Sequence, residues 1–97
     1  MSRYKGRPSK ATIEAAHPWA IWIRVPALPG LGERLNTLHD AAIAIGTYAT
    51  TGRMQGTADW VRFGFTTAKH AGLFRGRAIE IVGNLVEPGE PPDMRDR

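Results

Sequence analysis

The 97-residue sequence contains no cysteine. Without a thiol the chain forms no disulfide, offers no thiolate nucleophile and cannot bind zinc through cysteine. Long apolar runs are also missing, because the longest one, residues 18–23, is far shorter than the ~20 residues that a membrane-spanning helix requires. No apolar stretch follows the basic N-terminal residues directly, so a secretory signal is not expected. These absences predict a cytoplasmic protein that has no membrane partner.

Acidic side chains are absent from the first ten residues, which carry a net charge of +4. Residues 11–86 hold seven basic and five acidic side chains, and residues 87–97 hold two basic and four acidic ones. The excess positive charge of the chain therefore lies in its N-terminal segment. Such a segment suits binding to a polyanion, and it equally suits a tail that keeps the protein soluble.

Composition divides the chain into three regions. Residues 1–16 begin polar and basic and are interrupted by Gly6 and Pro8, which predicts a flexible basic tail. Residues 87–97 contain three prolines and a glycine, which are incompatible with a continuous helix or a central strand, and predict a second flexible tail. The intervening residues 17–86 are predicted to form one α+β domain.

Two kinds of periodicity alternate within this domain. Residues 19–25 and 60–65 alternate apolar and polar side chains and predict strands, whereas residues 48–54 are rich in threonine and predict an edge strand. Residues 31–45 repeat apolar side chains every three or four positions and predict a helix.

The C-terminal part of the domain completes the order of elements. After Thr66 or Thr67 as a cap, a shorter helix is predicted to run through Phe74 and to end at Gly76. Residues 78–82, or 78–86 at the longest, then predict a last strand, which gives the order βαββαβ. This is the order of the ferredoxin-like split βαβ sandwich, in which a four-stranded antiparallel sheet carries two helices on one face.

The alternation assigns each strand residue to a face of the predicted sheet. The side chains expected to face the helices and form the core are Ile21, Ile23, Val25, Val61, Phe63 and Phe65. The side chains expected on the uncovered face are Trp22, Arg24, Trp60 and Arg62. Because the first and third strands are neighbours in this fold, these last four residues would form a flat aromatic and cationic platform. A shift of one residue in register would reverse both faces.

Such a platform is suited to nucleic acid, because stacking a base on an aromatic ring contributes ~1–3 kcal/mol. The segment Arg62-Phe63-Gly64-Phe65 resembles the third-strand motif of the RNA-recognition-motif family, which binds RNA on this face. The alternation here turns Phe63 and Phe65 inward, which departs from that family. Tryptophan and arginine are also enriched at protein interfaces, so a homodimer or another protein partner bound through the open sheet face is the alternative.

The basic tail carries a second resemblance. Its segment Lys5-Gly6-Arg7-Pro8-Ser9-Lys10 resembles the core of an AT-hook, whose Gly-Arg-Pro lies in the narrow minor groove of A·T-rich DNA. The resemblance covers three core residues, and Lys5 stands where an AT-hook usually has arginine. The residues predicted to bind DNA or RNA are therefore, in the tail, Arg3, Lys5, Arg7 and Lys10 and, on the platform, Trp22, Arg24, Trp60 and Arg62.

Groups that could support catalysis are sparse. Ser2 and Ser9 lie in the tail, and the acidic residues of the domain occur singly. His17, His39 and His70 have no metal-ligand spacing and are expected to face solvent. We therefore expect neither enzymatic activity nor a cofactor nor a bound metal.

The chain as a whole resembles a family of small bacterial proteins with a ferredoxin-like pattern and no assigned activity. His17-Pro18 before the first strand and Val61-Arg62-Phe63-Gly64-Phe65 in the third strand carry this resemblance, which supports the fold and says nothing of function. The sequence thus predicts a small non-catalytic binding protein associated with nucleic acid. The alternative is a homodimeric protein-interaction module, such as a small regulator or inhibitor of a larger machine.

Overall fold

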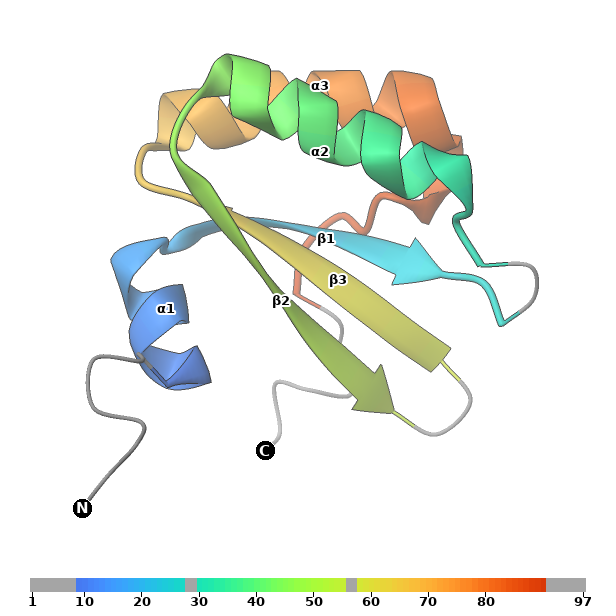
Figure 1. The fold of residues 1–97 in the computed structure, drawn as a ribbon, viewed down its shortest axis with the longest axis horizontal. Helices are drawn as coiled ribbons and strands as arrows, with labels where there is room; N and C mark the ends of the chain where they lie inside the picture. Colours follow the sequence, from blue (N-terminus) through green and yellow to red (C-terminus); the bar gives the residue numbers. More distant parts are fainter. Residues whose placement is uncertain (1–8, 28–29, 56–57, 91–97) are drawn as a thin grey trace.

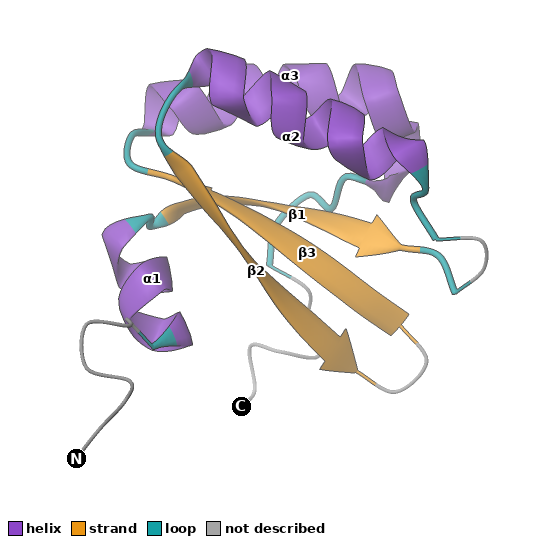
Figure 2. Cartoon of the chain, in the orientation of Figure 1, coloured by secondary structure: helices purple, strands orange, loops and turns teal. Residues whose placement is uncertain are grey.

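A three-stranded antiparallel sheet and three α-helices make up the α+β fold (Figure 1). The computed structural model of the protein describes residues 9–27, 30–55 and 58–90. Its elements in chain order are α1 (Lys10–Ala16), β1 (Trp19–Val25), α2 (Glu33–Ile45), β2 (Tyr48–Gln55), β3 (Ala58–Phe65), α3 (Ala68–Val82) and the 3-10 turn η1 (Gly83–Leu85). Helices α2 and α3 lie side by side over one face of the sheet, and α1 lies on the other side (Figure 2).

Strand β3 is the centre of the sheet and pairs antiparallel with β1 on one side and β2 on the other. Trp22 lies opposite Arg62, and Arg24 lies opposite Trp60. The prediction that the first and third strands are adjacent is therefore confirmed, as is the prediction that the second strand lies at an edge of the sheet.

The predicted fourth strand is wrong. Residues 78–82 belong to α3, which continues through Gly76 instead of ending there. The buried residues of α3 recur at helical spacing, namely Ala71, Phe74, Ala78 and Val82, and together they press one apolar face against the sheet. This packing outweighs the cost of glycine in a helix, which is about 1 kcal/mol per residue. Beyond α3, Val86 forms a single antiparallel bridge with Ile23 beside β1.

The predicted N-terminal tail also needs correction, because Lys10–Ala16 forms helix α1. The hydroxyl of Ser9 caps this helix by accepting a hydrogen bond from the backbone N–H of Thr12 at 3.1 Å. The helix sequence, KATIEAA, is rich in alanine, the residue most favourable to helices. Residues 1–8 and 91–97 of the predicted tails lie outside the described residues, whereas residues 87–90 of the predicted C-terminal tail are described, and Glu87 is hydrogen-bonded to the domain.

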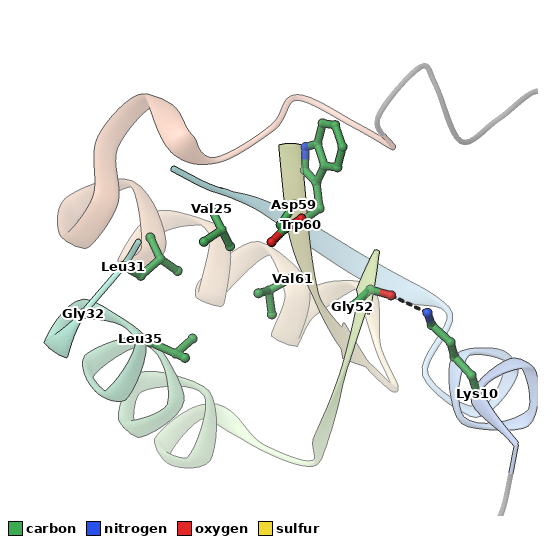
Figure 3. Close-up of a pocket in the computed structure, with 9 residues that line it drawn as sticks. All are labelled: Lys10, Val25, Leu31, Gly32, Leu35, Gly52, Asp59, Trp60 and Val61. Atoms are coloured by element: carbon green, nitrogen blue, oxygen red, sulfur yellow. Dashed lines mark hydrogen bonds between the residues drawn. The ribbon is translucent and has the colours of Figure 1, made fainter. Parts of the chain in front are cut away.

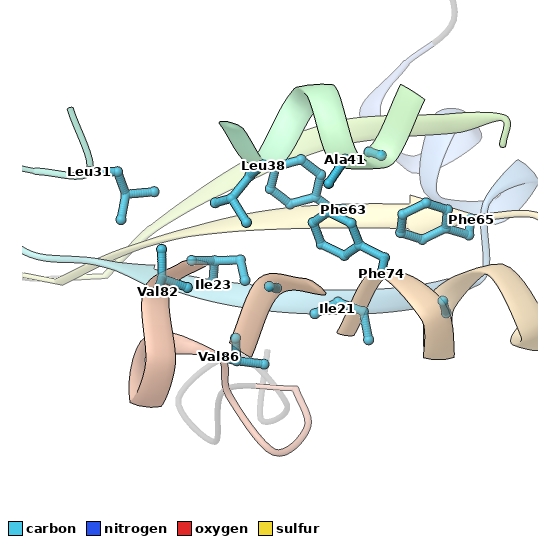
Figure 4. Close-up of a cluster of buried hydrophobic side chains, with 13 residues drawn as sticks. Ile21, Ile23, Leu31, Leu38, Ala41, Phe63, Phe65, Phe74, Val82 and Val86 are labelled. Carbon is cyan, nitrogen blue, oxygen red and sulfur yellow. The ribbon is translucent and has the colours of Figure 1, made fainter. Parts of the chain in front are cut away.

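The core lies between the sheet and helices α2 and α3, as the alternation predicted (Figure 4). The largest fully buried side chains are Phe63, Phe65, Phe74, Ile23 and Leu38. The rings of Phe63 and Phe74 stack with their centroids 4.7 Å apart. Ile21 is buried as well, and Val25 and Val61 are partly buried against the same cluster. The prediction of these core residues is confirmed.

Candidate binding face of the sheet

The four residues of the predicted platform lie on one face of the sheet, opposite α2 and α3. Cross-strand pairing brings Trp22 beside Arg62 and Arg24 beside Trp60. Trp22 and Trp60 also form a small cluster of their own, against which Ala20 packs. The expectation that this face is uncovered is wrong, because Trp22 is 5% exposed and both Trp60 and Arg62 are 8% exposed. Arg24 is exposed.

Helix α1 covers part of this face and is held there by polar contacts. The hydroxyl of Thr51 on β2 donates to Glu14 Oε2 at 2.5 Å. Lys10 Nζ donates to the carbonyl oxygen of Gly52 (Figure 3). At the end of the helix, the buried Arg62 Nη2 donates to the carbonyl oxygen of His17 at 2.9 Å. The guanidinium predicted to bind nucleic acid therefore holds the junction between α1 and β1.

Gly64 allows the end of α1, at His17, to lie close to the sheet. A Cβ atom at position 64 would lie 2.7 Å from the carbonyl oxygen of His17 and 2.9 Å from its Cβ. It would also lie 2.7 Å from Nη1 of Arg62. The absence of a side chain at Gly64 thus lets the end of α1 rest on the sheet.

Residues Val86 and Glu87, here called the C-terminal strap, run beside β1; the side chain of Val86 belongs to the core cluster, whereas that of Glu87 lies on the tryptophan face. The backbone N–H of Glu87 donates to the carbonyl oxygen of Trp22 at 2.8 Å. The side chain of Glu87 accepts a hydrogen bond at Oε2 from the indole Nε1 of Trp60 at 2.9 Å. Its carbonyl oxygen accepts from Arg75 Nη1 of α3 at 3.1 Å. The strap thus connects β1, β3 and α3 across residues that the sequence predicted to be uncovered.

The histidines are not solvent-facing as predicted, because all three are partly buried. His39 Nδ1 lies 2.8 Å from the Tyr48 hydroxyl, and its ring centroid is 5.2 Å from that of Phe63. His17 Nδ1 lies 2.8 Å from the carbonyl oxygen of Ile13. The ring of His70 lies so close to Gly46 that a Cβ there would be 2.7 Å from it. In the described part of the chain, no three acidic or histidine side chains form a group suited to a metal ion.

An apolar groove that the sequence did not predict lies between the N-terminal end of α2 and the sheet (Figure 3). Its volume is about 550 Å³, and Val25, Leu31, Leu35 and Val61 form its apolar walls. Lys10 and Asp59 are among its polar lining residues. The groove exists because of the position at which α2 begins relative to the strands. Hydrophobic periodicity in the sequence does not give that position. It offers an apolar surface beside one carboxylate and one ammonium group.

The tail residues Arg3, Lys5 and Arg7 lie outside the described residues, so the AT-hook resemblance stays a prediction. Lys10, the last cation of that segment, begins α1. The chain matches no family model, and neither a curated protein nor a solved structure is significantly similar to it. None of the helices that the structure describes has the length and apolar character needed to cross a membrane.

Proposed function

We propose that this protein is a small non-catalytic binding protein that associates with nucleic acid mainly through phosphate contacts. The observation that carries this proposal is the +4 charge of residues 1–10, which no acidic residue in the segment offsets. Cations that neutralise phosphates release counterions, and this release supplies most of the affinity of sequence-independent binding. Helix α1 supports the proposal, because it attaches this segment to the sheet face that carries the exposed Arg24.

Base stacking on the tryptophans has less support than phosphate binding. Trp22 and Trp60 are buried, and the indole of Trp60 is hydrogen-bonded to Glu87, so a base would stack on Trp60 only after Glu87 had moved. Arg62 already donates to the carbonyl oxygen of His17. We therefore assign the phosphate contacts to Arg3, Lys5, Arg7 and Arg24 and give the platform no stacking role while the strap is in place.

The test is a fluorescence-anisotropy titration with a labelled A·T-rich duplex and a labelled single strand. Neutralisation of four phosphates should make duplex affinity fall by about 10²-fold between 50 and 200 mM salt. A variant with serine in place of Arg3, Lys5 and Arg7 should bind far more weakly and show a much smaller salt dependence. The control variant carries serine in place of the exposed Arg34, Lys69 and Arg77, which removes the same charge from the helices. Equal affinity of the two variants would overturn the proposal.

The element order and the sheet order also support a ferredoxin-like assignment for this fold, in a form whose fourth strand is reduced to the Val86 bridge. The position of Val86 carries this assignment. It lies beside β1, which is where the last strand of that arrangement is found.

A protein-interaction module is the second candidate function. Three large apolar side chains are exposed on α2 and α3, namely Ile43 at 65%, Leu73 at 53% and Ile79 at 48%. A homodimer through these helices needs no displacement of the strap, whereas a homodimer across the tryptophans does. Solution mass at about 100 µM distinguishes the two forms, because Leu73→Glu should dissociate a dimer built on the helices and leave one built on the sheet intact.

A further inference from the structure

Helix α3 lies in the outer layer of the molecule, so one side of it faces away from the sheet (Figure 1). Four exposed residues, here called the α3 stripe, follow this side at intervals of four, three and four positions: Lys69, Leu73, Gly76 and Glu80. Leu73, its large apolar member, is 53% exposed. Such spacing places side chains in one row along a helix, as in the seam between two packed helices. The α3 stripe therefore has the form of a helix-pairing surface.

The two charged residues of the α3 stripe oppose the dipole of the helix. Lys69 lies in the first turn, where an acidic side chain is favoured, and Glu80 lies in the last turn, where a basic one is favoured. The whole of α3 is described, and it has neither an acidic residue in its first turn nor a basic residue in its last. Glu80 Oε1 accepts from Arg77 of the same helix, but so exposed a pair contributes little stability. Charges that do not favour their own helix indicate a contact with another molecule.

The α3 stripe is complementary to itself when two copies of the helix run antiparallel. Lys69 of each copy then lies beside Glu80 of the other, and Leu73 of each copy lies beside Gly76 of the other. Both pairs are centred between residues 74 and 75, so a single two-fold axis produces all four contacts, as a symmetric dimer requires. Gly76 has room for the incoming leucine, because a Cβ atom there would meet no described atom of its own chain within 4 Å.

We propose that α3 is the interface of a homodimer, in which a second copy of the chain packs antiparallel on the α3 stripe. This inference rests on the second candidate function, a homodimer through the helices, and adds the helix, the direction and the register. Leu73 supplies the apolar contact over Gly76. The contacts between Lys69 and Glu80 set the direction, because a parallel pair would bring like charges together.

The experiment reverses one charge at a time in the full chain and measures the dimer dissociation constant by sedimentation equilibrium. Lys69→Glu and Glu80→Lys each turn both ionic contacts into repulsive ones and should raise the dissociation constant about tenfold. An equimolar mixture of the two variants should recover the wild-type constant, since every ionic contact between different variants again joins opposite charges. The control, Glu90→Lys, makes the same change in net charge as Glu80→Lys at an exposed position outside α3 and should have no effect.

A further variant, Gly76→Leu, tests the apolar contact without a change in charge. The single chain has room for a side chain at this position, so the variant should keep the far-ultraviolet circular dichroism of the wild type. In the dimer the added side chain would occupy the place of Leu73 from the second copy, and the dissociation constant should rise about tenfold. Circular dichroism of the two charge variants should also be unchanged, because each reversal places a favourable charge at its end of the helix dipole.

The outcomes separate this inference from the function on which it rests. A dimer that neither charge reversal weakens, or two weakened variants whose mixture does not associate, would overturn the antiparallel α3 pairing and leave a homodimer through another surface standing. A wild-type chain that remains monomeric at about 100 µM would overturn the homodimer and this inference together. Nucleic acid takes no part in these measurements, so failure of the phosphate proposal would affect neither.

Discussion

The two faces of the sheet are both covered, but by different means. On the face toward α2 and α3, Ile23, Phe63 and Phe65 are fully buried by apolar packing. On the opposite face the cover consists of α1, a helix of seven residues in which no residue is buried, and of the Glu87 side chain, which is hydrogen-bonded to Trp60. The contacts that hold this second cover are mainly hydrogen bonds to backbone carbonyls and carboxylates.

The difference implies unequal stability. Full burial of one large apolar side chain contributes about 1.5–3 kcal/mol, whereas a hydrogen bond contributes a net ~0.5–1.5 kcal/mol. A helix as short as α1 is also unstable in isolation and depends on its contacts with the sheet. We therefore expect opening of the second cover to require less free energy than unfolding of the core. Arg24, one of the proposed phosphate contacts, lies on the face that opens more easily.

The largest effect should come from the apolar face. Phe63→Ala should lower the free energy of unfolding by about 3–5 kcal/mol, because it leaves a cavity beside Phe74 in the fully buried core. Thr51→Val, which removes the hydroxyl that donates to Glu14 under α1, should cost about 1 kcal/mol. Urea titration of both variants measures the two values. If Thr51→Val costs as much as Phe63→Ala, the two faces contribute equally and the comparison fails.

An intermediate effect should follow from adding one methyl group to the second face. Gly64→Ala places a Cβ 2.7 Å from the carbonyl oxygen of His17, so the end of α1 must move, at a cost of about 1–3 kcal/mol. The control is Gly72→Ala on α3, where an added Cβ meets no atom within 4 Å, and it should stabilise the protein by about 1 kcal/mol. Hydrogen exchange should show that Gly64→Ala lowers protection first in α1. Unchanged protection there would mean that α1 does not rest on Gly64.

Sequence periodicity was sufficient to predict those parts of the fold in which apolar side chains pack against one another. The alternation in β1 and β3 predicted the buried residues and the face on which Trp22 and Arg62 lie, because a shift by one residue would expose the core. It failed at the end of α3. Ile79 and Ile81 fit a strand period, but Ala78 and Val82 also fit a helical one, and packing of α3 against β1 decided between them.

The cover of the tryptophan face could not be predicted in this way. Its contacts come from single polar residues far apart in the chain, such as Glu87 with Trp60 and Arg62 with His17. No repeating pattern marks such pairs, and their partners become visible only when the strands have been placed. A local signal did exist for α1, because Ser9 is a favourable cap before an alanine-rich segment.

The smallest predicted effect compares the two covers of the sheet most directly, because one helix in each cover begins with the same kind of N-terminal cap. Ser9 caps α1 and Thr67 caps α3, and each hydroxyl accepts from the backbone N–H three residues later at 3.1 Å. Loss of such a cap costs its helix about 1 kcal/mol. Thr67→Ala should therefore lower the global free energy of unfolding by about 1 kcal/mol, since α3 is part of the core. Ser9→Ala should change it by less than about 0.5 kcal/mol and reduce hydrogen-exchange protection within α1 alone. Equal losses of global stability in urea would show instead that α1 unfolds together with the core, and the tryptophan face would then open only when the whole domain does.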